Sequence, residues 1–212
     1  MARPLPALVR LHLTGLRLLL VFTVVCGLAY PLLITGIAEL AFSHQANGSQ
    51  LKQNGQVVGS SLLGQNFDLP KQNPADPNEA ARPDPKWFQP RPSAAGPTGY
   101  DPLASGASNL GPNDAGLTRT VRERRAAAAA FDGVPPGQVP PDALTASGSG
   151  LDPDISPAYA DEQVDRVAKA RGLDPARVRQ LVKDHTQGRD LGFLGERRVD
   201  VVTLNLALAR LG

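Results

Sequence analysis

The sequence is poor in the residues on which catalytic and metal sites depend. Its one cysteine, Cys26, lies in an apolar stretch, which excludes an intramolecular disulfide and a cysteine-based metal site. The three histidines, His12, His44 and His185, are far apart in the sequence. It contains neither a Gly-x-Ser-x-Gly nucleophile motif nor a Gly-x-x-x-x-Gly-Lys phosphate loop. We therefore expect no catalytic residues, no metal site and no firmly bound cofactor.

The sequence also has few aromatic residues and no large excess of either positive or negative charge. Aromatic residues make up 5% of the chain, so the core must be mostly aliphatic. The net charge of +2 is too balanced to indicate nucleic acid as a partner. By contrast, 21 glycines and 20 prolines indicate a loop-rich fold.

The longest apolar run predicts a membrane-spanning helix. Residues 18–38 contain no charged side chain, and about 20 helical residues cross a hydrocarbon core roughly 30 Å thick. We expect a short N-terminal segment over 1–15, a transmembrane helix over 16–41 and a soluble domain over 42–212. Pro31 removes one helical hydrogen bond, which predicts a kink.

Charged residues flanking the run predict its orientation. Arg3, Arg10 and Arg17 precede it and Glu39 follows it, which favours a cytoplasmic N-terminus and an extracytoplasmic soluble domain in a bacterial cell membrane. The alternative is a cleaved signal peptide, with Gly36-Ile37-Ala38 as its cleavage site. The run is longer than a typical signal core, which favours the retained single-pass anchor.

The soluble part has an α+β pattern without repeats. A polar stalk over 43–58 leads to a short strand at 56–58, and nine prolines exclude a long helix between 70 and 102. Trp87 and Phe88 are the expected buried anchors of that proline-rich loop. Helices are expected to begin at caps formed by Asn113 or Asp114, by Ser156 and by Asp174. Together with apolar periodicity, these caps predict helices over 114–131, 157–172, 175–188 and 203–211, and a strand over 199–201.

Residues 145–157 have two interpretations. Their small polar residues and glycines are typical of a flexible linker. Yet Ser156-Pro157 marks a helix start, which favours an ordered loop that includes Ser147 and Ser149. Asp152-Pro153-Asp154 brings two carboxylates together, but the further ligands of a calcium loop are missing. Asp152 is better explained as the cap of a turn.

Six blocks of sequence resemble, in the right order, the C subunit (KdpC) family of the bacterial Kdp potassium-transporting P-type ATPase. The resemblance covers nearly the whole chain. The blocks are Tyr30-Pro31-Leu32 with Gly36, residues 59–67, residues 87–94, residues 104–113, residues 145–157 continuing to 172, and residues 195–207. The chain departs from the family pattern at Asp154, where the family has His, and at Arg197 and Asp200, where it has Pro and Asn.

The resemblance implies an accessory, non-catalytic subunit of a high-affinity potassium uptake complex. In that family the subunit stabilises the assembly of a channel-like, potassium-binding subunit and a P-type subunit that hydrolyses ATP. It is also described as a catalytic chaperone that raises the ATP affinity of the ATPase subunit. Leu63, Gly64 and Gln65 can be likened to a nucleotide-contact motif, or they form a turn. Because an external domain cannot touch cytoplasmic ATP, an indirect effect through subunit packing is the simpler hypothesis.

We expect contacts with the partner subunits and with membrane lipid. The candidate interface residues are Tyr30, Pro31, Gly36, Trp87, Arg91, Ser147, Ser149, Asp152 and Asp154. One alternative is a domain that covers the ion entrance, where four acidic side chains would favour cations: Asp152, Asp154, Asp161 and Glu162. These acids can equally form an ordinary solvated acidic stretch. Another alternative is an unrelated membrane-anchored binding protein or enzyme.

Overall fold

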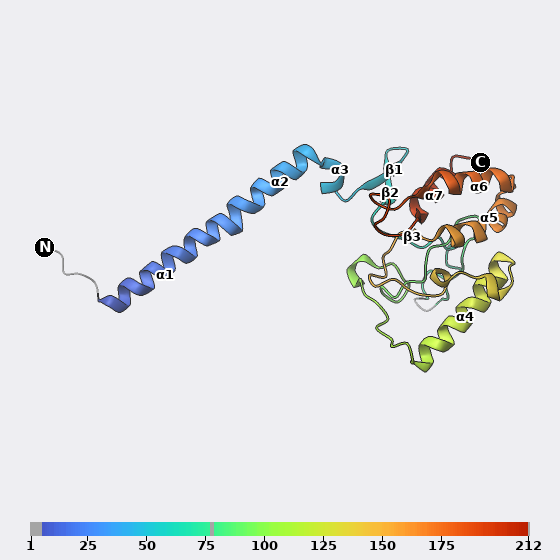
Figure 1. The fold of residues 1–212 in the computed structure, drawn as a ribbon, viewed down its shortest axis with the longest axis horizontal. Coiled ribbons are helices and arrows are strands. Elements are labelled where there is room, and N and C mark those ends of the chain that lie inside the picture. Colours follow the sequence, from blue (N-terminus) through green and yellow to red (C-terminus); the bar gives the residue numbers. More distant parts are fainter. Residues whose placement is uncertain (1–5, 77–78, 212) are drawn as a thin grey trace. The chain divides into compact units, whose positions relative to one another are not determined.

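The chain forms two compact units, residues 1–49 and residues 50–212. The computed structural model describes residues 6–76 and 79–211. The first unit is helical, and the second combines helices with two small antiparallel sheets, in agreement with the predicted α+β class (Figure 1).

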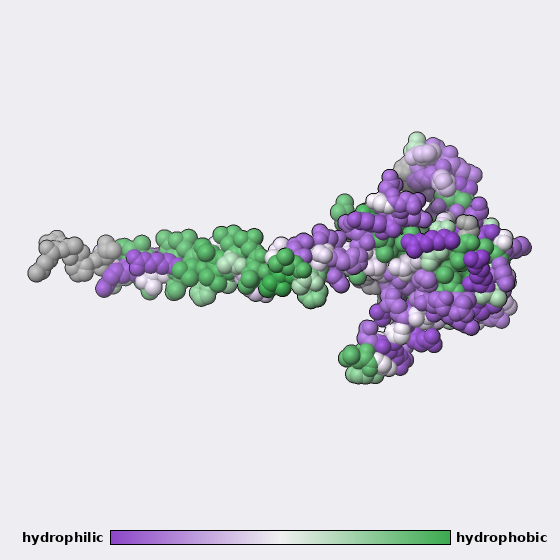
Figure 2. Space-filling view, turned by 90° about the horizontal axis from the view of Figure 1, so that it is seen from above, coloured by the Kyte–Doolittle hydropathy of each residue, from purple (hydrophilic) through white to green (hydrophobic). Residues whose placement is uncertain are grey.

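The helical unit contains the candidate membrane span, Ala7–Ala41, which is long and apolar enough to cross a bilayer. It consists of α1 (Ala7–Val24), a π-helical turn (Val25–Ala29) and α2 (Tyr30–Ala41), and the short helix α3 (Ser43–Ala46) follows. Among the described residues, the rest of the chain buries none of the most apolar part of this helix. Hydrophobic residues cover most of its surface, whereas the visible face of the soluble unit is mostly hydrophilic (Figure 2).

A π-helical turn lies where the sequence predicts a kink. Val25–Ala29 directly precedes the turn that holds Pro31. Proline has no N–H to donate, and a widened turn accommodates the interrupted hydrogen-bond ladder. The helix also begins at Ala7, earlier than the expected start of the span.

A β-hairpin opens the soluble unit. β1 (Gln50–Gln53) pairs antiparallel with β2 (Gln56–Ser60). Asn54 and Gly55 join the strands with φ values of +52° and +80°, the signs that a type I′ turn requires. The predicted strand at 56–58 is confirmed as part of β2. The prediction of a polar stalk was wrong for residues 50–53, which form β1, and Asn54-Gly55 is the sequence signal of that strand.

The second sheet has the order β3-β5-β4, with both pairs antiparallel. Its strands are β3 (Asp154–Ile155), β4 (Thr186–Gln187) and β5 (Arg198–Asp200). Ile155 and Thr186 both face Val199 in the register, so this residue ties the three strands together. Residues 154–155, within the segment whose composition resembles a linker, are thus part of a sheet.

Four helices complete the unit: α4 (Ala115–Asp132), α5 (Pro157–Arg171), α6 (Pro175–Asp184) and α7 (Val201–Leu208). Short 3₁₀ turns lie at η2 (Pro102–Ala104), η3 (Pro136–Gln138) and η4 (Pro141–Ala143). The predicted caps are confirmed: side-chain oxygens of Asp114, Ser156 and Asp174 accept backbone N–H groups. α6 ends at Asp184 rather than near Gly188, because the chain turns there into β4.

The core lies between α5, α6, α7 and the proline-rich loop. It is mostly aliphatic, as the scarcity of aromatic residues predicts. Phe88 is fully buried, as predicted, whereas Trp87 is only partly buried against the core. α5, α6 and α7 gather at one side of this unit, while the N-terminal turns of α4 project from it (Figure 1). Fully buried aliphatic side chains come from α5, α6, β5 and α7: Val164, Val167, Val178, Val199, Leu204 and Leu208.

Candidate functional site

Two amide side chains hold the proline-rich loop in the core. The carboxamide of Asn205 accepts a hydrogen bond from the Phe88 N–H and donates one to the Phe88 carbonyl, both at 2.9 Å. Gln163 does the same for Gln89, at 2.6 and 3.1 Å. Each pair satisfies a buried backbone donor and acceptor that have no strand partner. The loop is therefore an ordered part of the domain.

Arg166 extends this network into a buried ion pair. Its Nε lies 2.6 Å from Asp132 Oδ1, and its Nη1 donates to the carbonyl oxygens of Pro85 and Trp87. The Arg166 and Asp132 side chains are only 6% and 2% exposed. Burial raises the pKa of Asp132, and Arg166 opposes that shift. No local sequence signal indicates this pair, because its members are on different helices.

Glu162 adds a second acid beside Asp132. Its Oε1 is buried and has no hydrogen-bond partner among the described residues. Burial, reinforced by the carboxyl groups of Asp132 and Asp142, raises the pKa of Glu162 to about 7. The negative charge expected at this position is therefore partly suppressed near neutral pH.

Arg91, in the proline-rich loop, binds residues 145–152 through hydrogen bonds and an ion pair. Its Nη1 donates to Asp152 Oδ2 at 3.1 Å, and its Nε and Nη2 each lie 3.4 Å from the Thr145 carbonyl oxygen. Ser93 Oγ also donates to the Gly150 carbonyl at 2.6 Å. Two of the candidate interface residues, Arg91 and Asp152, are thus brought together, and the linker interpretation of this segment was wrong.

Ser147 and Ser149 shape the same segment. Ser147 Oγ accepts the N–H of Gly150 at 2.9 Å, and Ser149 Oγ accepts the N–H of Leu151 at 3.0 Å. Gly150 has φ +68°, and a Cβ there would lie 2.8 Å from that of Ala95. Both serines therefore have local structural roles, and their contact with a partner stays a prediction.

In the Leu63-Gly64-Gln65 string, Gly64 packs closely against the Tyr100 ring. The N–H of Gly64 donates to the Leu151 carbonyl at 2.8 Å. A Cβ at Gly64 would collide with the Tyr100 ring and would lie 2.7 Å from the Asp152 carbonyl oxygen. Glycine is therefore needed at position 64 for close packing, and a nucleotide contact at this string stays a prediction.

Asp152 caps a turn, as predicted. Its Oδ1 accepts the Asp154 N–H at 3.0 Å, while Asp154 Oδ2 lies 3.3 Å from Arg198 Nε. Asp161 lies 3.1 Å from Arg179. Because three of the four acids proposed to attract cations have an arginine partner, much of their charge is compensated within the domain.

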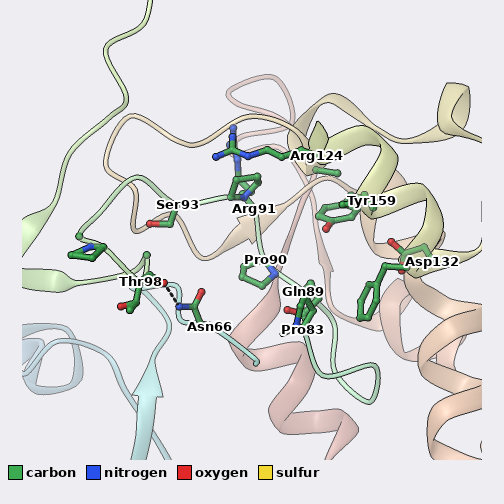
Figure 3. Close-up of a pocket in the computed structure, with 18 residues that line it drawn as sticks. Asn66, Pro83, Gln89, Pro90, Arg91, Ser93, Thr98, Arg124, Asp132 and Tyr159 are labelled. Atoms are coloured by element: carbon green, nitrogen blue, oxygen red, sulfur yellow. Dashed lines mark hydrogen bonds between the residues drawn. The ribbon is translucent and has the colours of Figure 1, made fainter. Parts of the chain in front are cut away.

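A groove of about 530 Å³ separates the proline-rich loop from α4 and α5 (Figure 3). Its apolar lining includes Phe131, Tyr159 and four prolines, and its polar lining includes Arg91, Arg124 and Asp132. Asn66 donates to the Thr98 carbonyl at 2.8 Å along one side (Figure 3). Its size is in the range of small-molecule pockets, but its proline-rich wall carries no nucleophile and base in contact.

The other candidate residues do not belong to the lining of this groove. Trp87 packs against Phe67, with ring centroids 6.2 Å apart, and lies beneath the Arg171 guanidinium. Tyr30, Pro31 and Gly36 belong to the helical unit and are exposed in it. Over residues 6–76 and 79–211, no three His, Cys, Asp or Glu residues gather as metal ligands.

Comparison with known proteins covers almost the entire chain. Residues 12–210 match the profile of the KdpC family, described as K⁺-transporting ATPase, c chain. A Potassium-transporting ATPase KdpC subunit from Kineococcus radiotolerans is 54% identical over 208 residues, which cover 98% of this chain and 97% of the relative. One from Streptomyces coelicolor is 49% identical over 212 residues, covering 95% and 93%. The chain therefore belongs to the KdpC family.

Proposed function

We propose that the chain is an accessory subunit of a potassium-transporting ATPase, anchored in the cell membrane by the helix Ala7–Ala41. It stabilises the assembly of a channel-like, potassium-binding subunit with a P-type subunit that hydrolyses ATP, and potassium is the transported ion. The observation that carries the proposal is the family match over residues 12–210. The candidate membrane span at the N-terminus supports it.

The exposed surface of the helical unit supports a role in assembly. Among the described residues, no other part of the chain covers its apolar side chains, which supports surroundings of lipid or partner helices. A Cβ at Gly36 would meet nothing within 4 Å, so a second helix can approach closely there. Tyr30, Pro31 and Gly36 remain the candidates for this contact.

We place the soluble unit on the extracytoplasmic side. Arg10 and Arg17 near the start of the helix, and Glu39 near its end, support this orientation. Protease added to sealed, inside-out membrane vesicles tests it. The soluble unit should resist digestion until the vesicles are opened with detergent, and digestion in intact inside-out vesicles would contradict the orientation.

The effect on ATP affinity is proposed to be indirect. On the extracytoplasmic side the chain cannot reach cytoplasmic ATP, and Gly64 has a packing role. Contacts between subunits can instead favour the conformation of the ATPase subunit that binds ATP. Photolabelling of the intact complex with an azido-ATP should label the ATPase subunit and leave this chain unlabelled. Label in the peptide that contains Leu63, Gly64 and Gln65 would establish direct contact.

The alternative of a free, tethered binding protein is tested by purification. In mild detergent, a tagged chain should elute together with the channel-like and ATP-hydrolysing subunits at a constant ratio. Elution of the chain alone, under conditions in which the other subunits remain associated, would support the alternative.

A further inference from the structure

The segment between β4 and β5 forms a small hairpin with an exposed apolar tip. In this apolar hairpin (residues 189–196), Leu191 is 83% exposed, Phe193 70% and Leu194 49%. The other strongly exposed large apolar residues of the described soluble unit occur singly or in pairs, such as Leu103 or Leu62 with Leu63. Exposed aromatic and aliphatic side chains that cluster in this way are typical of interaction sites.

The tip is held in a defined shape. Asp190 and Leu194 exchange both backbone hydrogen bonds at 2.9 Å, and the Phe193 N–H donates to the Asp190 carbonyl at 3.3 Å. Leu191 and Gly192 have φ values of +53° and +83°. These are the signs of a type I′ turn, whose first central position favours Asn, Asp or Gly.

Leucine at this position is therefore unexpected for the turn itself. A bulky residue with positive φ is strained, and asparagine would form the same turn more easily. Since the Leu191 side chain is exposed, packing within the domain does not explain it either. A contact outside the domain explains the leucine at position 191, because such a contact would use the very side chain that the turn disfavours.

The charges around the tip indicate what makes that contact. Arg189 pairs with Glu196 at 3.0 Å, and Arg198 pairs with both Asp154 and Asp190. Loops that dip into a bilayer gain from free cations beside the apolar tip, whereas most of the charges here are compensated. A rigid apolar tip whose neighbouring charges are paired with one another is suited to an apolar hollow on a protein surface.

We propose that the apolar hairpin inserts into an apolar hollow on the extracytoplasmic face of another subunit of the transporter. Leu191 and Phe193 are the anchors of this contact, which fixes the soluble unit in the complex independently of the membrane helix. The inference rests on the proposed function, because it needs a partner subunit on that side of the membrane.

Photo-crosslinking of the intact complex tests the contact directly. With benzoylphenylalanine in place of Phe193, illumination should join the chain to another subunit, identified by mass spectrometry. Crosslinks only to lipid, only to a second copy of this chain, or to nothing would overturn the inference. If the chain still co-purifies with its partners in that case, the proposed function stands. If the wild-type chain does not co-purify at all, the proposed function itself fails.

Leu191→Asn separates docking from folding. Asparagine suits the turn, so the variant should unfold at the same denaturant concentration as wild type, or a higher one. Yet crosslinking from position 193 should fall about tenfold, the usual effect of losing one anchor residue. Leu103→Asn, which changes another exposed leucine, serves as the control and should leave the yield unchanged. Undiminished crosslinking in Leu191→Asn, or an equal loss in the control, would contradict the proposal.

Discussion

Asp154 and Asp200 lie directly opposite each other across β3 and β5. Asp200 caps α7, accepting the Thr203 N–H at 2.7 Å, while Arg198 pairs with Asp154. Burial, followed by the carboxylates of Asp152 and Asp200, raises the pKa of Asp154 to about 6, against the effect of Arg198. Because burial also raises the pKa of Asp200, ionising this pair costs free energy of folding.

The first prediction concerns the pH dependence of stability. Because the pKa of Asp154 is raised in the folded state, its stabilising contribution is complete below about pH 4 and is lost as the pH rises through about 6. Asp154→Asn should remove this loss and raise the free energy of unfolding at pH 7.5 by roughly 1–2 kcal/mol. Trp87, the only tryptophan of the chain, provides the fluorescence signal for urea unfolding of the detergent-solubilised protein.

Asp161→Asn is the matched control, since Asp161 is an exposed acid paired with Arg179. It should change the free energy of unfolding at pH 7.5 by less than about 1 kcal/mol. Equal slopes for wild type and Asp154→Asn would show that Asp154 ionises normally, contrary to the account.

The second prediction tests the packing at Gly64. In Gly64→Ala the new methyl group would meet the Tyr100 ring and the Asp152 carbonyl. It should lower the free energy of unfolding by about 1–3 kcal/mol, the usual cost of overpacking. Gly148→Ala is the control, because a Cβ there meets nothing within 4 Å. A stable Gly64→Ala variant whose complex nevertheless loses ATP affinity would favour the nucleotide-contact interpretation instead.

The third prediction concerns the buried pair of Arg166 and Asp132. Arg166→Met should cost about 3–5 kcal/mol, because Asp132 would lose its partner in the core. Arg179→Met removes an arginine from exposed ion pairs and should cost about 1 kcal/mol or less. Unfolding monitored through Trp87 compares the two variants. Similar losses in both would mean that burial of the Arg166 pair adds little.

Local signals made most of the helices predictable. Asp114, Ser156 and Asp174 act on backbone groups only a few residues away, so their capping roles can be read from neighbouring sequence. The two-residue strand β4 has no comparable signal, since its partner β5 lies about ten residues further along. β1 has such a signal, because the Asn54-Gly55 turn follows it directly.

The hydrogen-bond network around the proline-rich loop could not be predicted from the sequence, for a physical reason. Arg166 reaches Asp132 and Pro85, and Asn205 reaches Phe88, across long stretches of chain. Only the packing of the whole domain brings such residues together. The same holds for Arg91 and Asp152, which were both named as candidates but whose mutual contact the sequence did not indicate.

Potassium-stimulated ATP hydrolysis by the purified complex tests the central claim most directly, namely that this chain is needed for assembly of a working transporter. The complex is prepared with the chain, without it, and with its helix Ala7–Ala41 replaced by an unrelated membrane helix. We predict that potassium stimulates hydrolysis only in the complete complex. Full stimulation in preparations that lack the chain would contradict the account.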